Sequence, residues 1–364
     1  MNRFPRNPFS VALTMFVLGT ASASCFAQMM GGGYKPGSVR DGQGLAAPLD
    51  PPEQTGDPAF WQVEKDIRLH HFSVGKGTPI LFVHGGPGFP TREVPPGLEK
   101  LADDYSVHFF DQRGCGRSTR PFDRFDTQNF PQSMMKLNQT LGIATQIADI
   151  ERIRRILGPD KLILVGHSFG GFIASLYAAE FPDHVAALIL VAPADMLVFP
   201  PQDSSGGLFD AIRRKLPEDK QAEYAKFLAE YMNFSGVFAK TDRELAANNY
   251  KLAEFYRMAE EADGRPPVSQ PALEDCGGWM VMAIYFTLGM SYDLRDPVRE
   301  VEAPVLILHG DRDLVRPEVS RGYADVFPNA RVEMITGAGH MIFNDRPDEF
   351  ADAVRSFLRG LNDK

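Results

Sequence analysis

Five short apolar runs constrain the fold of this chain more than any other feature of its sequence. They lie at residues 80–83, 107–110, 162–165, 187–191 and 305–308. Runs of this kind are typical of strands buried on both faces of a parallel sheet. Helical patterns separate them, the clearest at residues 138–157, and an alternating stretch at 67–74 predicts an antiparallel start. The chain is therefore expected to be an α/β protein whose mostly parallel sheet is flanked by helices.

The alternation of strands and helices breaks between residues 196 and 296. No run typical of a buried strand occurs there, and helical patterns such as residues 242–262 take its place. We interpret residues 196–296 as a helical cap inserted into an α/β core. The core is expected to comprise residues 61–195 and 297–364.

The first residues have the pattern of a secretory signal peptide. Arg3 and Arg6 give a positive start, residues 10–19 form a short apolar run, and Ala-Ser-Ala at residues 21–23 offers a cleavage site. The apolar run is too short to anchor the chain across a membrane. We expect residues 1–27 to be removed and the protein to be exported, as a periplasmic or secreted protein.

Three further features concern the mature chain: a candidate lipid attachment site, the segment after the signal peptide, and the two remaining cysteines. Cys25 offers an alternative to cleavage, lipid attachment as in bacterial lipoproteins, although Ser22 stands where such signals usually carry Leu. Residues 28–60 are rich in Gly, Pro and Asp, which predicts a linker or a surface arm. Cys115 and Cys276 permit one disulfide, but we expect two free or buried thiols.

Composition excludes several classes of partner. The net charge of -9 over 364 residues lacks the basic footprint of a nucleic-acid binder. Beyond the N-terminal run, no apolar stretch reaches the roughly 20 residues that a membrane span needs. No His or Cys cluster has the spacing of metal ligands, so we expect no metal cofactor.

The strongest chemical signal is Gly-His-Ser-Phe-Gly at residues 166–170. It matches the G-x-S-x-G nucleophile elbow, and it follows an expected strand and precedes an expected helix, which is the context that gives this motif meaning. The glycines leave room for the strand and helix to close around a strained turn that exposes Ser168. The alternative is a chance match without catalysis. His167 is expected to point away from the serine and to be structural.

A serine hydroxyl needs a base and a group that orients the base. His340 follows an expected strand, so it should lie at the same carboxyl edge of the sheet as Ser168. Its alternative is a surface loop histidine. Asp311 and Asp313 both follow the run at residues 305–308, and we favour Asp313 as the acid because it lies further round the loop. The order Ser, Asp, His is the order in α/β-hydrolases.

A tetrahedral intermediate also needs two N–H donors facing its oxyanion. One is expected from Phe169, at the start of the helix after the serine. The other is expected from Gly86, with Gly85 as a further candidate, in the glycine-rich loop at residues 84–88. The alternative for this loop is a glycine turn without a ligand.

Four motifs together resemble α/β-hydrolases of the proline iminopeptidase group. They are His-Gly-Gly-Pro-Gly at residues 84–88, Asp-Gln-Arg-Gly-Cys-Gly-Arg-Ser at 111–118, the elbow at 166–170 and Gly-Ala-Gly-His at 337–340. The resemblance covers the core on both sides of the insertion. It implies a Ser-Asp-His triad, a helical cap over the site, and no metal or organic cofactor. Within the second motif, Asp111 is expected to tie down its own turn through Arg113.

The chain departs from that group at two places. Phe169 stands where the group tends to carry tryptophan after the nucleophile, and the cap lacks a tryptophan-rich segment with acidic residues for a substrate amine. Glu274 and Asp275 beside Trp279 are the candidates for binding the amine. Exposed acidic side chains without a ligand are the alternative.

These observations predict a serine hydrolase that cleaves a small amide or ester through an acyl-enzyme. A proline iminopeptidase-like aminopeptidase acting on a short peptide is the leading interpretation. A carboxylesterase is the alternative, because the apolar stretch at residues 279–292 would suit an acyl pocket. A non-catalytic binding protein on the same scaffold is an alternative of another class. Epoxide and haloalkane hydrolysis need a carboxylate nucleophile, so Ser168 argues against both.

Overall fold

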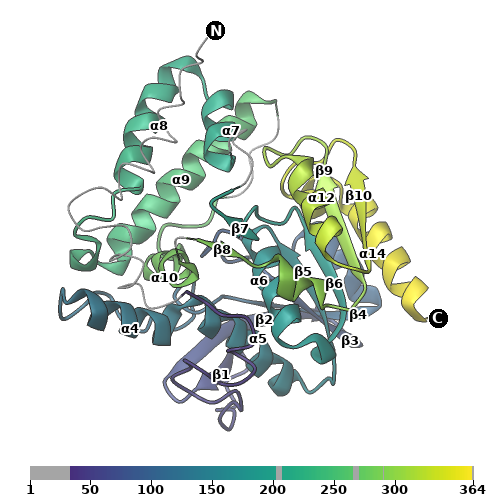
Figure 1. Ribbon diagram of the computed structural model, residues 1–364. Coiled ribbons are helices and arrows are strands. Elements are labelled where there is room, and N and C mark those ends of the chain that lie inside the picture. Colours follow the sequence, from purple (N-terminus) through teal and green to yellow (C-terminus); the bar gives the residue numbers. More distant parts are fainter. Residues whose placement is uncertain (1–32, 202–206, 265–269, 290, 363–364) are drawn as a thin grey trace.

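The computed structural model describes residues 33–201, 207–264, 270–289 and 291–362. The predicted signal peptide, including Cys25, lies outside the described residues. An eight-stranded sheet organises the described chain, in the order β1-β2-β4-β3-β5-β6-β9-β10 (Figure 1). Its strands are β1 Phe60–Glu64, β2 Ile67–Gly75, β3 Thr78–Val83, β4 Tyr105–Phe110, β5 Leu162–His167, β6 Val185–Val191, β9 Val305–Gly310 and β10 Ala330–Ile335.

The pairing of the strands agrees with the pattern of apolar residues. β2 pairs antiparallel with both β1 and β4, whereas every other pair in the sheet is parallel. In β3, Leu81 and Val83 belong to one buried cluster, and Ile80 and Phe82 belong to the cluster on the other face. Because both faces are covered, the strand has no polar alternation. The predicted α/β fold with a mostly parallel sheet is confirmed.

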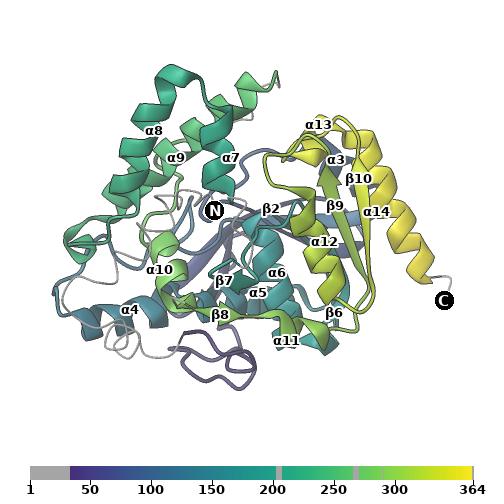
Figure 2. The same cartoon turned by 45° about the horizontal axis from the view of Figure 1, so that its top comes forward.

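Helices cover both faces of this sheet (Figure 2). One apolar cluster joins the sheet to α4, α5, α6, α10, α11 and α12, and the other joins it to α3, α13 and α14. The bounds of these helices are α3 Pro96–Glu99, α4 Phe130–Leu141, α5 Ile143–Leu157, α6 Phe169–Glu180, α10 Trp279–Leu288, α11 Arg295–Arg299, α12 Pro317–Val326, α13 Ile342–Asp345 and α14 Pro347–Asn362. The short 3-10 helices are Lys100–Asp103, Pro182–His184 and Val237–Ala239.

The inserted segment is helical and forms a lobe beside the sheet in Figures 1 and 2. Its helices α7 Leu208–Lys215, α8 Glu218–Tyr231 and α9 Asp242–Ala262 share an apolar core of their own. A two-stranded antiparallel pair, β7 Val198–Phe199 with β8 Tyr292–Asp293, joins the two ends of the segment. We refer to the segment from α7 to α10 as the cap.

Helix α10 carries most of the apolar stretch that was predicted to suit an acyl pocket. Nine of its ten side chains are buried, eight of them within the main apolar cluster, and only Tyr285 is partly exposed. A helix that is apolar on all sides is buried on all sides. Helix α10 therefore packs into the core, and its Met282 also lines a hollow in the cap.

The residues that precede the sheet form an arm on the surface of the core. Tyr34 donates a hydrogen bond from its hydroxyl to the buried carboxylate of Glu180, and the amides of Gly37 and Arg40 donate to the same carboxylate at 2.8 and 3.0 Å. The Tyr34 amide donates to the carbonyl oxygen of Thr287 in α10 at 2.8 Å. The arm therefore connects the end of α6 with the end of α10.

Strand register brings four loops to one edge of the sheet. Val83 pairs with Gly166, His167 with Val191, and Val191 with Leu308, while Ile335 pairs with Gly310. The loops after β3, β5, β9 and β10 therefore begin at nearly the same level.

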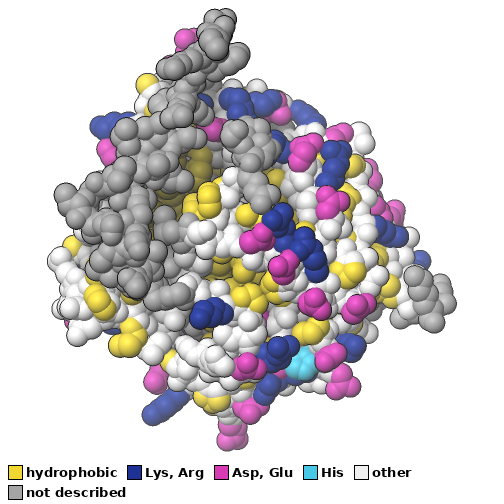
Figure 3. Space-filling model, in the orientation of Figure 1, with side chains coloured by type: hydrophobic (Ala, Val, Ile, Leu, Met, Phe, Trp, Pro, Cys, Tyr) yellow, Lys and Arg dark blue, Asp and Glu magenta, His cyan; other side chains and the backbone are white. Residues whose placement is uncertain are grey.

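On the face shown in Figure 3, acidic and basic side chains are intermixed.

Candidate active site

The turn between β5 and α6 holds Ser168 in a strained backbone conformation. Its φ of 53° and ψ of -120° lie outside the regions that non-glycine residues usually adopt. A Cβ at Gly166 would lie 2.6 Å from the carbonyl oxygen of Gly170, and a Cβ at Gly170 would collide with the carbonyl of Val83. Glycine is required at both positions because the helix turns back directly over the strand. This is the geometry of a nucleophile elbow.

Asp313 and His340 meet at the same edge of the sheet. Nδ1 of His340 lies 2.8 Å from Oδ2 of Asp313, while Oδ1 of Asp313 accepts a hydrogen bond from the Val315 amide at 2.8 Å. The Asp313 side chain has no exposed surface. Burial alone would raise its pKa, but the neighbouring imidazole and these hydrogen bonds outweigh burial and lower the pKa of Asp313. An ionised carboxylate can thus hold the imidazole in one tautomer.

The structure brings Asp313, and not Asp311, to the histidine. Asp311 accepts a hydrogen bond from the Gly337 amide at 2.7 Å and is exposed. The loop after β9 turns between these two residues, so the Asp311 carboxylate faces outward and the Asp313 carboxylate faces His340.

The glycine-rich loop after β3 lies against the elbow. A Cβ at Gly85 would lie 3.0 Å from Cβ of Ser168, so the loop backbone and the serine are in close contact. Gly86 has a φ of +117° and precedes a cis peptide bond to Pro87. Phe169 is the first residue of α6, where the amide has no partner within the helix. The predicted oxyanion donors thus lie on two segments that flank Ser168.

Two cap contacts with this site had no signal in the sequence. The ring of Tyr256 in α9 lies 5.7 Å from the ring of His340, measured between centroids. Leu314 directly follows Asp313 and belongs to the apolar core of the cap. Both contacts join segments far apart in the chain, so no local pattern could have predicted them.

The residues expected to bind a substrate amine do not form a free anionic site. Arg92 donates two hydrogen bonds to the Asp275 carboxylate, at 2.6 and 2.8 Å. Trp279 is fully buried and packs edge-to-face against Phe125. Glu274 is exposed. The structure therefore does not support this trio as an amine site, because one carboxylate is neutralised and the indole is inaccessible.

The expected pairing of Asp111 with Arg113 is wrong. Arg113 is buried and bonds to the carboxylates of Asp149 and Glu64. Asp111 does tie down its own turn, but through the Arg117 amide at 2.8 Å, and it also accepts hydrogen bonds from Arg92. A residue two positions away on a tight turn points in a different direction, so proximity in sequence did not predict the partner.

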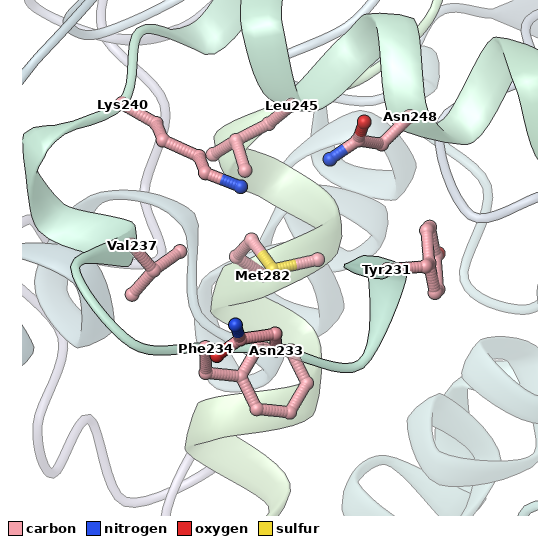
Figure 4. A pocket seen from close by; sticks show the side chains of 8 residues that line it. All are labelled: Tyr231, Asn233, Phe234, Val237, Lys240, Leu245, Asn248 and Met282. Carbon is pink, nitrogen blue, oxygen red and sulfur yellow. The ribbon is translucent and has the colours of Figure 1, made fainter. Parts of the chain in front are cut away.

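The cap contains a small hollow between the end of α8 and the start of α9 (Figure 4). Lys240 and Asn248 direct their polar ends toward it, while Phe234 and Met282 provide apolar walls. Met282 belongs to the apolar stretch predicted to suit an acyl pocket, whereas the other seven lining residues were not predicted as site residues. Ser168, Asp313 and His340 are not among the residues that line this hollow.

A groove of about 290 Å³ lies beside the loop after β9, residues 311–314, which carries Asp313 (the acid loop). Arg214 and Lys215 of α7 line it together with residues 311–314. Since the Asp313 side chain is buried, only the main chain of that residue faces the groove. The carboxylate that contacts His340 is therefore shielded from the solvent in the groove.

The two described cysteines are free and buried. Burial raises the pKa of Cys276 to about 12 and raises the pKa of Cys115 well above its ordinary value. Neither thiol is a thiolate at neutral pH, so neither is a competing nucleophile. Among the described residues, no group of three or more His, Cys, Asp or Glu side chains is arranged to hold a metal ion. Within the same ranges, no helix has the length and apolarity needed to cross a bilayer.

Comparison with known proteins places these observations in a family. The family model described as the alpha/beta hydrolase fold matches residues 78–347. The chain is 27% identical over 301 residues to a proline iminopeptidase of Lactobacillus delbrueckii subsp. lactis, covering 78% of this chain and 92% of the relative.

Solved structures share the fold at lower identity. A thermophilic esterase from Thermogutta terrifontis has a TM-score of 0.52 at 23% identity, covering 85% of this chain and 97% of the esterase. A proline iminopeptidase from Mycobacterium smegmatis has a TM-score of 0.52 at 21% identity, covering 82% and 96%. With a family model that spans most of its length, this chain belongs to the α/β-hydrolase fold family and is a hydrolase.

Proposed function

We propose that the protein is a serine hydrolase that cleaves a small amide or ester through an acyl-enzyme. Ser168 is the nucleophile, His340 the base and Asp313 the acid that orients the base. The observation that carries this proposal is the 2.8 Å contact between His340 Nδ1 and a buried Asp313 carboxylate, at the sheet edge that also holds the strained Ser168. Three residue types with these roles are what nucleophilic catalysis by serine requires.

The reaction then proceeds in two halves. Ser168 Oγ attacks the substrate carbonyl carbon while His340 Nε2 takes the hydroxyl proton, and Asp313 stabilises the resulting imidazolium without taking a proton. The amides of Phe169 and of Gly86 or Gly85 stabilise the oxyanion. Collapse of the intermediate returns the proton to the leaving amine or alcohol. Water then attacks the acyl-enzyme, His340 again relays the proton, and the acid product leaves.

Two substrate classes fit this chemistry. A proline iminopeptidase-like aminopeptidase is favoured by the relatives of that name, which align with more than three quarters of this chain. A carboxylesterase is favoured by a specific observation: Asp275, the expected partner of a substrate amine, is already bound by Arg92. An ester has no free amine that would need such a partner.

Purified protein should be assayed on proline arylamides and on short-chain nitrophenyl esters. Turnover of the arylamide supports the aminopeptidase, and ester turnover without amide turnover supports the esterase. Ser168→Ala is the control and should abolish either activity. Activity that persists in this variant would contradict the serine mechanism.

A fluorophosphonate probe tests the remaining alternative, a binding protein on the same scaffold. The intact protein should be labelled, and Ser168→Ala should not, because the probe reacts only with an activated hydroxyl. An unlabelled wild-type protein that is fully folded would favour the binding protein.

Export is a separate part of the proposal. Its support is the sequence pattern of residues 1–27, with Cys25 as the site of the lipid-anchored alternative. N-terminal analysis of the mature chain distinguishes the outcomes. A free terminus between residues 24 and 28 supports cleavage and release, a lipid-modified Cys25 supports anchoring, and an intact residue 1 contradicts export.

A further inference from the structure

We infer that His167, the residue before Ser168, is a positioning residue. It holds the loop that carries His340, residues 336–341 (the base loop), against the nucleophile elbow. This inference rests on the proposed serine-hydrolase function. The sequence predicted that its side chain points away from the serine and is structural. Its position between the nucleophile and the base gives it a role in the reaction that the triad does not describe.

The contact that defines this role is a hydrogen bond to the main chain of the base. Nε2 of His167 lies 3.0 Å from the carbonyl oxygen of His340. Because a carbonyl oxygen can only accept, Nε2 of His167 must carry a proton. The ring is buried, with 6% of the residue exposed, so water cannot easily replace this bond.

Other contacts fix the ring in its orientation. The His167 ring lies 4.8 Å from the His340 ring and 5.1 Å, edge to face, from the Phe343 ring. On the other edge of the ring, a Cβ at Gly85 would lie 3.1 Å from Nδ1 of His167. The glycine-rich loop at residues 84–88 (the oxyanion loop) therefore packs directly against the His167 ring. One side chain thus touches the base loop and the oxyanion loop, and its backbone leads directly into the nucleophile.

The charge state of the ring is compatible with this role. Burial, and secondarily the neighbouring His340, lower the pKa of His167 to about 3. The ring is therefore a neutral imidazole at any working pH. It does not compete for the Ser168 proton, and it places no second positive charge beside the His340 imidazolium.

His340 is consequently held from two directions. Asp313 binds Nδ1 of its ring, and His167 binds the carbonyl oxygen of its main chain. Loss of the second contact leaves the ring oriented by the acid while the loop that carries it is free to shift. Because displacement of a catalytic group by about 1 Å can cost about 10²-fold in rate, such a shift should lower kcat more than it raises KM.

The test compares two replacements of His167. In His167→Phe the ring remains but the donor is lost, whereas in His167→Gln an amide nitrogen can reach the position of Nε2 and donate to the same carbonyl. We expect a kcat about 10- to 100-fold below wild type for His167→Phe with KM changed by less than about 3-fold. His167→Gln should recover kcat to within about 5-fold of wild type.

Controls separate positioning from packing and from the proposed function. His108→Phe makes the same chemical change at a histidine that contacts Ser106 and Trp61 instead, and it should leave kcat unchanged. If His167→Phe does not fold, as judged by thermal melting, His167→Asn replaces it, because its shorter amide cannot reach the carbonyl and kcat should fall as described above.

Two results would overturn the inference while leaving the serine mechanism intact: wild-type kcat in the donor-free variant, or an equal loss of kcat in His167→Gln. A wild-type protein with neither turnover nor fluorophosphonate labelling would instead overturn the proposed function, and the inference with it.

Discussion

Replacing Asp313 by asparagine perturbs one atom of the proposed triad with almost no change in volume. The carboxylate accepts two hydrogen bonds, one from Nδ1 of His340 and one from the Val315 amide, both 2.8 Å long. An asparagine has only one acceptor oxygen. If that oxygen stays with the Val315 amide, the amide NH₂ group faces Nδ1 and requires this nitrogen to be unprotonated. The proton then moves to Nε2 of His340, which can no longer take the proton of Ser168.

The magnitude follows from that wrong tautomer. A buried acid-to-amide change of this kind lowers kcat by about 10⁴-fold in a serine triad. With about 1.36 kcal/mol per factor of ten, the activation free energy rises by about 5.4 kcal/mol. KM should change little, because the substrate is not bound by Asp313. The fold should persist, since the Val315 amide keeps an acceptor.

A matched control lies two residues away in the same loop. Asp311→Asn makes the same change at an exposed carboxylate that accepts only from the Gly337 amide, and the asparagine oxygen can keep that bond. Its kcat should stay within about 3-fold of wild type. Steady-state kinetics on the better of the amide and ester substrates measures both variants. Equal losses in the two variants, or more than a tenth of wild-type kcat in Asp313→Asn, would refute the assignment of the acid.

Three further predictions test charge and packing elsewhere in the core and the cap. Arg92→Ala leaves the buried Asp111 without its cation and releases Asp275, so urea denaturation should give a free energy of unfolding about 3 kcal/mol lower; an unchanged value would contradict this. Leu314→Ala should cost about 2–3 kcal/mol in the same assay and also lower kcat, whereas full activity would mean that the cap core does not support the acid loop. Burial would raise the pKa of Glu151, but hydrogen bonds from two arginines outweigh it and lower the pKa from 4.5 to about 2, so the stability from ionised Glu151 is present above pH 4.5 and lost toward pH 2. Glu151→Gln should therefore unfold at lower urea concentration at pH 7 and approach wild type near pH 2, and a difference that grew on acidification would contradict this sign.

The sheet could be predicted from the sequence because burial on both faces leaves a continuous apolar run. The prediction of the sheet was incomplete where a strand continues beyond its apolar residues. β5 extends from Leu162 through Gly166 and His167, which pair with Leu190 and Val191 although neither has an apolar side chain. The reason is that contacts at the turn into α6 determine these residue types: a Cβ at Gly166 would lie 2.6 Å from the carbonyl oxygen of Gly170, and Nε2 of His167 lies 3.0 Å from the carbonyl oxygen of His340.

Placing Ser168, Asp313 and His340 near one another required only the topology. Parallel strands end at one edge, so residues just after the strands meet there whatever their separation in the chain. Partner choice within a loop required more. Arg113 was expected to pair with nearby Asp111, yet it bonds to Asp149 of α5, because direction on a tight turn changes with every residue.

The cap was the least predictable part, since it touches the site through side chains and not through strand register. Leu314 belongs to the cap core while its neighbour Asp313 binds the base, and Tyr256 of the cap lies against His340. We therefore expect a change in packing at Leu314 or Tyr256 to reach both Asp313 and His340. Substitutions at these two contacts should therefore alter kcat together with KM.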